Sequence, residues 1–447
     1  MLVVQILRKI KISFYVLIIV VVYALMYGIN LKKYQRGEII QHDVISYYAY
    51  WPAVLIYHDL SFGFVSNLPE NSSVTVWTQT SPSGMPTLKM TMGVAVMTTP
   101  FFIMAHLLSD IFGFESNGYS AIYQIFLLFA AIFYLFAGLF FLRKTLLQFF
   151  SEMATSLVLA IIVLATNLFY YTSVEPGMSH VFSFFLFAWG LWLMNRWFET
   201  PGWQYSVFLG LAAGLIILVR PSNGVVFLVP VLFSMGRIKS IQWKYLPLIL
   251  LVMFLILIPQ LAYWKFSTGK WIYYAYGDER FYFSDPKIMQ GLIGYRKGWL
   301  VYTPVMVLAL LGFFFMRDKI RDFQIPILIY FVVNLYVVFS WWCWWYGGGF
   351  GARPLIESYV FLALPLAVSI KRVLSSRRVI KYLTMAVLVF LVYLNLFQIR
   401  QYRTTLLHWD STSRELYWEV FLSHHWPENY DALLDPPDYK AAQFRQE

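Results

Sequence analysis

The sequence has little charge and almost no cysteine. Only 13% of its 447 residues are Asp, Glu, Lys or Arg, whereas 60% are apolar; soluble domains carry about 25% charged residues. The single cysteine, Cys343, excludes an internal disulfide bond and any metal site built from several cysteines. The short alternating segments of a transmembrane barrel do not occur, and no internal repeat is evident. A soluble domain and a cysteine-based metal site are therefore excluded.

Long apolar runs recur from Phe14 to Phe397. Many have about 17–20 residues, which is enough to cross the hydrocarbon core of a bilayer as a helix, and the two that flank residues 220–223 are shorter. We therefore predict an all-α membrane protein with about eleven transmembrane helices. The predicted spans are residues 14–30, 119–142, 156–171, 181–197, 205–219, 224–235, 245–266, 299–316, 323–340, 355–370 and 382–398.

The net charge of +11 is distributed in a way that predicts the orientation of these spans. With Arg8, Lys9 and Lys11 in the cytoplasm, the short inner loops are basic and the outer segments are nearly neutral. This asymmetry accounts for the charge without a nucleic-acid partner. Residues 90–108 are also apolar, but a crossing there would turn every later basic loop outward. We therefore predict that this piece is re-entrant or lies along the outer surface.

The predicted topology places all the long connections outside. Residues 1–399 form one transmembrane domain whose first outer loop is residues 31–117. A second long outer loop comprises residues 267–297, and residues 400–447 form a short extracytoplasmic tail. We expect the protein to work on its outer face.

Polar residues at the outer ends of the spans suggest chemistry there. Asp43 follows the first span, Glu175 and His180 lie in a turn, Arg220 precedes a proline, and Arg353 follows a glycine-rich stretch. A carboxylate can take a proton from an attacking hydroxyl, and guanidinium groups can neutralise a departing phosphate. Each residue alone has an ordinary explanation, such as a helix cap or a side chain reaching the interface. Their convergence on one face indicates a site.

Five further residues are candidates for substrate binding on the same face. Tyr47 follows Asp43, and the tryptophan-rich segment before Arg353 contributes an aromatic plane that can pack a sugar. An aromatic belt at the interface is the simpler explanation of those tryptophans, and the loop charges have a simple surface explanation. The candidates are Tyr47, Lys89, Asp278, Glu279 and Trp345.

The order of these elements resembles the C-type membrane glycosyltransferases (GT-C fold), such as protein O-mannosyltransferases, aminoarabinose transferases and oligosaccharyltransferase catalytic subunits. Asp43 stands where that family has an acid motif in its first outer loop, and Glu175 matches a later acidic turn. Arg220 matches an Arg-Pro turn. Residues 297–304 match a Lys-Gly-aromatic-x-x-Tyr-Thr-Pro segment, and residues 344–353 match a segment ending in Phe-Gly-x-Arg. The resemblance covers nearly the whole membrane region, through short motifs.

This resemblance implies transfer of a sugar from a polyprenyl-phosphate donor to an extracytoplasmic acceptor, with inversion. The acceptor is a glycan, a lipid or a protein, and the enzyme would lie in a bacterial inner membrane. Asp43 would act as base, Arg220 and Arg353 would hold the leaving phosphate, and Glu175 with His180 would orient the acceptor or Asp43.

Two departures from the family pattern bear on metal binding. Val44, rather than a second acid, follows Asp43, and the Glu175 turn also lacks a second acid. We therefore assign no metal, although Glu175 with His180 is where a divalent cation would bind.

Two other classes of protein remain open. A transporter or lipid flippase binds substrate near the bilayer midplane between structural repeats. The candidate charges here lie at span ends instead, and no repeat is evident. A non-catalytic assembly subunit that keeps the fold is the second alternative.

Overall fold

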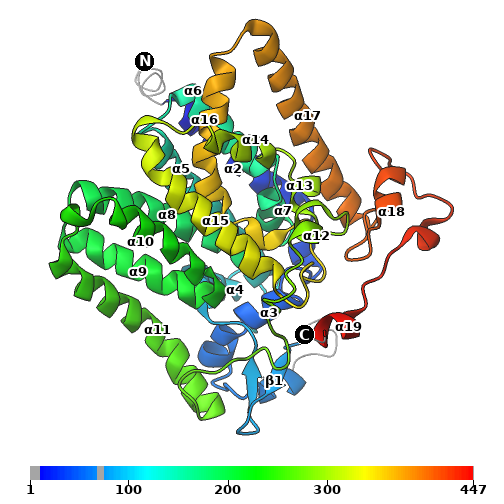
Figure 1. Cartoon of the computed structure of the whole chain (residues 1–447). Coiled ribbons are helices and arrows are strands. Elements are labelled where there is room, and N and C mark those ends of the chain that lie inside the picture. Colours follow the sequence, from blue (N-terminus) through cyan, green and yellow to red (C-terminus); the bar gives the residue numbers. More distant parts are fainter. Residues whose placement is uncertain (1–10, 68–74, 446–447) are drawn as a thin grey trace.

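Helices make up 66% of the protein in the computed structural model, which describes residues 11–67 and 75–445 (Figure 1). Among the described residues, five helices are long and apolar enough to cross a membrane: Ile12–Gln35, Ala121–Leu146, Trp243–Thr268, Asp318–Phe339 and Arg378–Arg403. They contain α2 (Ile12–Asn30), α5 (Ala121–Leu146), α11 (Leu246–Thr268), α15 (Gln324–Phe339) and α17 (Arg378–Arg403). The fold is that of an all-α membrane protein. Arg8 and Lys9 lie outside the described residues.

The other predicted spans are formed by further helices, several of which are short or interrupted, whereas α8 (Ser179–Glu199) is a continuous helix of 21 residues. The others are α6 (Glu152–Leu164), α7 (Leu168–Ser173), α9 (Trp203–Val219), α10 (Leu228–Met235), α13 (Trp299–Tyr302), α14 (Met306–Phe313) and α16 (Tyr359–Leu374). The predicted span 299–316 is divided at Thr303 and Pro304. Proline lacks the backbone N–H of a helix and disfavours helical geometry in the residue before it, which explains the interruption.

The core is centred on α16. Every residue of α16 from Tyr359 to Ile370 is buried, as expected for a helix that is apolar on all sides. Its neighbour α14 approaches so closely that a Cβ at Gly312 would lie 1.9 Å from the carbonyl oxygen of Pro365. Small residues allow such approach between helices in membranes. The apolar surfaces of α11 and α17 face outward instead.

The two ends of the helical bundle carry different contacts and different short elements. Near the end marked by α6 in Figure 1, Arg143 donates to Ser13 Oγ at 2.6 Å, and the Ser13 amide donates to Glu152 at 3.1 Å. Arg237 and Asp322, from two other predicted inner loops, also form an ion pair. The opposite end carries α3 (Asp43–Tyr48), the hairpin β1–β2 (Thr78–Thr80 and Pro86–Leu88) and α19 (Tyr439–Gln443).

Helix α4 (Gly93–Ser109) contains the apolar piece predicted not to cross. Just before its start, the Met92 amide donates to Gln260 at 2.8 Å, in the final part of α11. Near its end, His106 Nδ1 is 2.6 Å from the hydroxyl of Tyr123, in the first turn of α5. Both contacts lie toward helix ends that the sequence analysis assigns to the outer side.

The C-terminal tail packs against two loops that the sequence analysis predicts to be outside. It contains α18 (Arg414–Glu419) and ends in α19, where the hydroxyl of Tyr282 donates to the carbonyl of Gln443. Arg445 also donates to the carbonyl of Trp342 at 2.8 Å. A short helix, α12 (Ile288–Ile293), lies in the second of the long loops that were predicted to be outside. The tail is thus joined to the segments on both sides of α15.

Candidate active site

One cavity of about 1290 Å³ collects most of the predicted site residues. Its wall includes Asp43, Tyr47, Lys89, Glu175, His180, Arg220, Glu279 and Arg353. Two predicted residues are not part of this wall. Asp278 is exposed on its loop, and the buried Trp345 packs against Tyr439 with ring centroids 5.4 Å apart. The structure therefore brings together all the predicted candidates except these two.

Asp43 and Arg353 form an ion pair in this cavity. Arg353 Nη2 donates to Asp43 Oδ2 at 2.9 Å, although the residues are 310 positions apart. Asp43 is the first residue of α3, which Tyr47 anchors to α8 by donating to Ser179 Oγ at 3.3 Å. The preceding residue, His42, has a φ of +52°, a conformation that costs a non-glycine residue about 1–3 kcal/mol. The turn at His42 and the anchor at Tyr47 thus set the position of Asp43.

The segment before Arg353 depends on its glycines. Gly347, Gly349 and Gly351 all have positive φ values, which glycine adopts without steric cost. A Cβ at Gly349 would lie 2.5 Å from the hydroxyl oxygen of Tyr171, so this segment can pass close to α7 only without a side chain. Burial is the largest single effect and lowers the pKa of Arg353, but Asp43 and the other acidic groups nearby together outweigh burial, so this pKa lies above its ordinary value. Arg353 is therefore a fixed positive charge.

Glu357 is a site residue that the sequence analysis missed. Its Oε1 lies 2.9 Å from His180 Nδ1 and 3.9 Å from Arg220 Nη1. His180 therefore pairs with Glu357, whereas Glu175 accepts a hydrogen bond from the hydroxyl of Tyr170 at 2.7 Å. The sequence did contain a signal, because Glu357 lies within the predicted span 355–370. An ionisable residue inside an apolar span usually has a functional role.

The acid residues of the cavity have different partners. Among the described residues, no three His, Cys, Asp or Glu side chains gather closely enough to hold a cation. Glu175 and His180, where a divalent cation was considered, have separate partners in Tyr170 and Glu357. The acids near the two arginines instead contact guanidinium groups. The guanidinium N–H groups of Arg220 and Arg353 suit an anion better than a cation.

A second ion pair lies elsewhere in the wall. Lys89 contacts Glu279, and Glu279 also accepts a hydrogen bond from Trp342 Nε1 at 3.0 Å. The ammonium of Lys89 lies 4.9 Å from the centre of the Tyr276 ring, within the range of a cation–π contact. This part of the cavity places the aromatic ring of Tyr276 beside the charges of Lys89 and Glu279. A ligand with a ring and polar substituents could pack on the aromatic ring and hydrogen-bond to the charged groups.

No protein-family model and no curated protein sequence matches this chain. Its function is therefore argued from the chemistry of the cavity.

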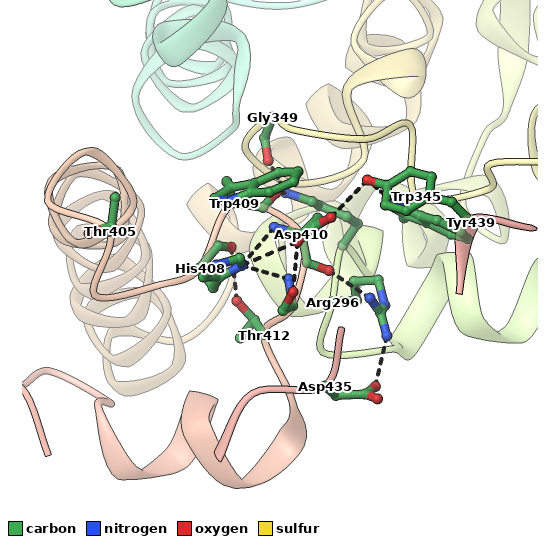
Figure 2. Close-up of polar contacts among 12 residues, drawn as sticks. Arg296, Trp345, Gly349, Thr405, His408, Trp409, Asp410, Thr412, Asp435 and Tyr439 are labelled. Carbon is green, nitrogen blue, oxygen red and sulfur yellow. Dashed lines mark hydrogen bonds and ion pairs between the residues drawn. The ribbon is translucent and has the colours of Figure 1, made fainter. Parts of the chain in front are cut away.

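Lys297 contacts both the tail and the glycine-rich segment, through Trp409 and Gly349, which are labelled in Figure 2. The ammonium of Lys297 donates to the carbonyls of Gly349 and Trp409, the latter at 2.5 Å. Nearby, Arg296 donates to the carbonyl of Asp410 at 2.7 Å, and Tyr439 donates to the carboxylate of Asp410 at the same distance. These contacts join the tail to the segment that carries Arg353.

Lys297 gives a prediction about stability and pH. Burial, with the neighbouring charge of Arg353, lowers the pKa of Lys297 from 10.5 to about 7. Between these two values the unfolded chain binds a proton that the folded protein lacks, so the free energy of unfolding rises with pH in this window. One such group contributes up to about 1.4 kcal/mol per pH unit. We expect the melting temperature of the wild type, relative to Lys297→Met, to increase from pH 7 to pH 9.

The control for this prediction is Lys270→Met, which alters an exposed lysine and should melt in parallel with the wild type across the same pH range. If the melting temperatures of the wild type and Lys297→Met, measured in detergent, also change in parallel with pH, Lys297 does not titrate as described.

Proposed function

We propose that this protein is a membrane glycosyltransferase that moves a sugar from a polyprenyl-phosphate donor to an extracytoplasmic acceptor. The observation that carries the proposal is the contact between Asp43 and Arg353 in a cavity that Arg220 also lines. This arrangement places a proton acceptor beside two groups that bind phosphate. The volume of about 1290 Å³ leaves room for a sugar together with an acceptor.

The proposed reaction is a single displacement. Asp43 takes the proton of an acceptor hydroxyl, and that oxygen forms a bond to the anomeric carbon of the donor sugar. The bond from this carbon to the phosphate oxygen breaks, and its electron pair leaves with the polyprenyl phosphate. A phosphate needs no general acid in order to leave, so one carboxylate is sufficient, in contrast to hydrolysis by a carboxylate pair.

The two arginines stabilise the charge that develops on the leaving phosphate. Within the described part of the chain, the guanidinium of Arg353 donates only through Nη2, to Asp43, which leaves its other N–H groups for the phosphate. A preorganised charge of this kind stabilises the transition state by about 3–4 kcal/mol. Arg220 contributes a second positive charge, and Tyr346 lies under it, with the ring centre 5.8 Å from the guanidinium carbon.

The test of this function is transfer by the purified protein. The protein is reconstituted in liposomes with polyprenyl-phosphate sugars labelled in the sugar, together with membrane glycans, lipids or an unfolded protein as acceptors. We expect label to move to one acceptor class while unlabelled polyprenyl phosphate accumulates. Movement of the intact donor across the bilayer with no new glycosidic bond would instead identify a flippase. Activity that requires a second subunit would favour the assembly-subunit alternative.

We also propose the eleven-span topology, with α4 on the outer side. The contacts of α4 with the ends of α11 and α5 support this arrangement. In a Cys343→Ala background, single cysteines at Ser66 and Ser284 should react with an impermeant thiol reagent from outside. Cysteines at Ser240 and Ser375 should react only after the membrane is opened. If α4 crosses, Ser66 and Ser284 will instead be labelled from opposite sides.

A further inference from the structure

Glu357 is a buried acid that the mechanism above does not use. Only 2% of its surface is exposed, and it does not line the cavity. Its Oε1 lies between His180 and Arg220, whereas its Oε2 has no hydrogen-bond partner among the described residues. A buried carboxylate oxygen without a donor is energetically costly. Such a residue at the edge of a cavity is a candidate for a functional role.

The contact between Glu357 and His180 determines which imidazole nitrogen carries hydrogen. A carboxylate has only acceptor atoms, so the hydrogen between Glu357 Oε1 and His180 Nδ1 belongs to the histidine. In a neutral imidazole the other nitrogen, Nε2, is then an acceptor. His180 lines the cavity and contacts Glu357, whereas Glu357 itself does not line the cavity. The ring of Tyr171 packs edge-on against His180 at 5.0 Å and limits its rotation.

We propose that Glu357 is a positioning residue, which fixes His180 with hydrogen on Nδ1 so that Nε2 accepts a hydrogen bond from a substrate hydroxyl. Buried carboxylates that hold the far nitrogen of a functional histidine act in the same way in other sites. That the hydroxyl belongs to the donor sugar or the acceptor rests on the proposed function. The state of the His180 ring does not depend on it.

The contact with Arg220 offers a different explanation of Glu357. As a simple counterion of Arg220, Glu357 would act through charge alone, and removal of that charge would be harmful whatever happens at His180. The distances favour His180, at 2.9 Å against 3.9 Å for Arg220. Glu357→Gln separates the two roles. Its carboxamide oxygen can replace Oε1 as an acceptor, and its NH₂ group would occupy the position of the unpartnered Oε2.

The first experiment measures the tautomer of His180 without substrate. The protein is labelled with ¹⁵N-histidine, and Glu357→Leu and Glu357→Gln are compared with the wild type in lipid at pH 8. The chain has 7 histidines. The ¹⁵N signal of His180 is identified as the one that disappears from the spectrum of the His180→Gln variant. We expect hydrogen on Nδ1 in the wild type and in Glu357→Gln, and loss of that preference in Glu357→Leu. Hydrogen on Nε2 in the wild type would overturn the inference, even if Glu357→Leu does not fold.

The second experiment measures how the two residues are coupled in transfer. We expect Glu357→Leu to lower kcat/KM by about 10–100-fold, as loss of a residue that orients a functional histidine does, and Glu357→Gln to recover most of the activity. Glu357→Leu combined with His180→Gln should be no worse than His180→Gln alone. The inference would be overturned if the losses of kcat/KM in the two single variants multiply in the double variant. It would also be overturned if Glu357→Gln is as impaired as Glu357→Leu. Absence of transfer by the wild type would instead contradict the proposed function and leave the tautomer measurement valid.

Discussion

Asp43→Asn should abolish sugar transfer while the protein remains folded. The carboxamide keeps the shape of Asp43 and can still accept a hydrogen bond from Arg353, but it does not take up a proton at neutral pH. We expect kcat to fall by about 10²–10⁴-fold, the range that a general base contributes. The measurement is the rate of label transfer from the donor, with size-exclusion chromatography to confirm that the variant is folded.

The same substitution should not weaken binding of the donor. In the ligand-free protein the charge of Asp43 is paired with Arg353 and competes with any phosphate that approaches the same guanidinium. Removal of that charge should therefore leave the dissociation constant of polyprenyl phosphate unchanged or lower it. The matched control is Asp278→Asn, which neutralises an exposed acid outside the cavity and should retain full activity. An Asp43→Asn variant with undiminished transfer would remove Asp43 from the mechanism.

The sequence was sufficient for the helical class of the fold and for picking out most of the candidates that line the cavity, because both depend on local properties. An apolar run long enough to cross a bilayer is visible in any window of the sequence. An interruption is less visible, because Pro304 hardly changes the mean hydropathy of a window but removes a backbone donor. Helices α13 and α14 therefore appear where one continuous span was predicted.

Partners within the site could not be predicted in this way. Glu175 and His180 are close in sequence, but α8 begins between them and directs His180 toward Glu357, 177 residues later. Such a pairing depends on the rotation of a helix about its own axis, and a single sequence does not encode this in a readable pattern. The contact between Asp43 and Arg353 was not predicted either, although both residues were candidates for the site. Both were expected at the outer face, and opposite charges that are withdrawn from water favour direct contact.

Arg353→Gln should reduce transfer by about 10²–10³-fold, because the leaving phosphate loses a positioned charge. Arg353→Lys should be intermediate, since lysine retains the charge but lacks the planar fork of N–H groups that fits a phosphate. The measurement is kcat/KM for the donor. Arg414→Gln, which changes an exposed arginine in α18, is the control and should behave as the wild type.

Reduced transfer alone does not show that Arg353 acts on the phosphate, because Arg353→Gln also leaves Asp43 without its partner. Binding of polyprenyl phosphate in an Asp43→Asn background separates the two effects, since the base carries no charge there. If Arg353 binds the phosphate, adding Arg353→Gln should weaken binding by at least about 10-fold, because a hydrogen bond to a charged group contributes about 1.5–3 kcal/mol. If Arg353 only holds Asp43 in place, the single and double variants should bind equally. That result would assign the phosphate to Arg220 and leave Arg353 as a support for the base.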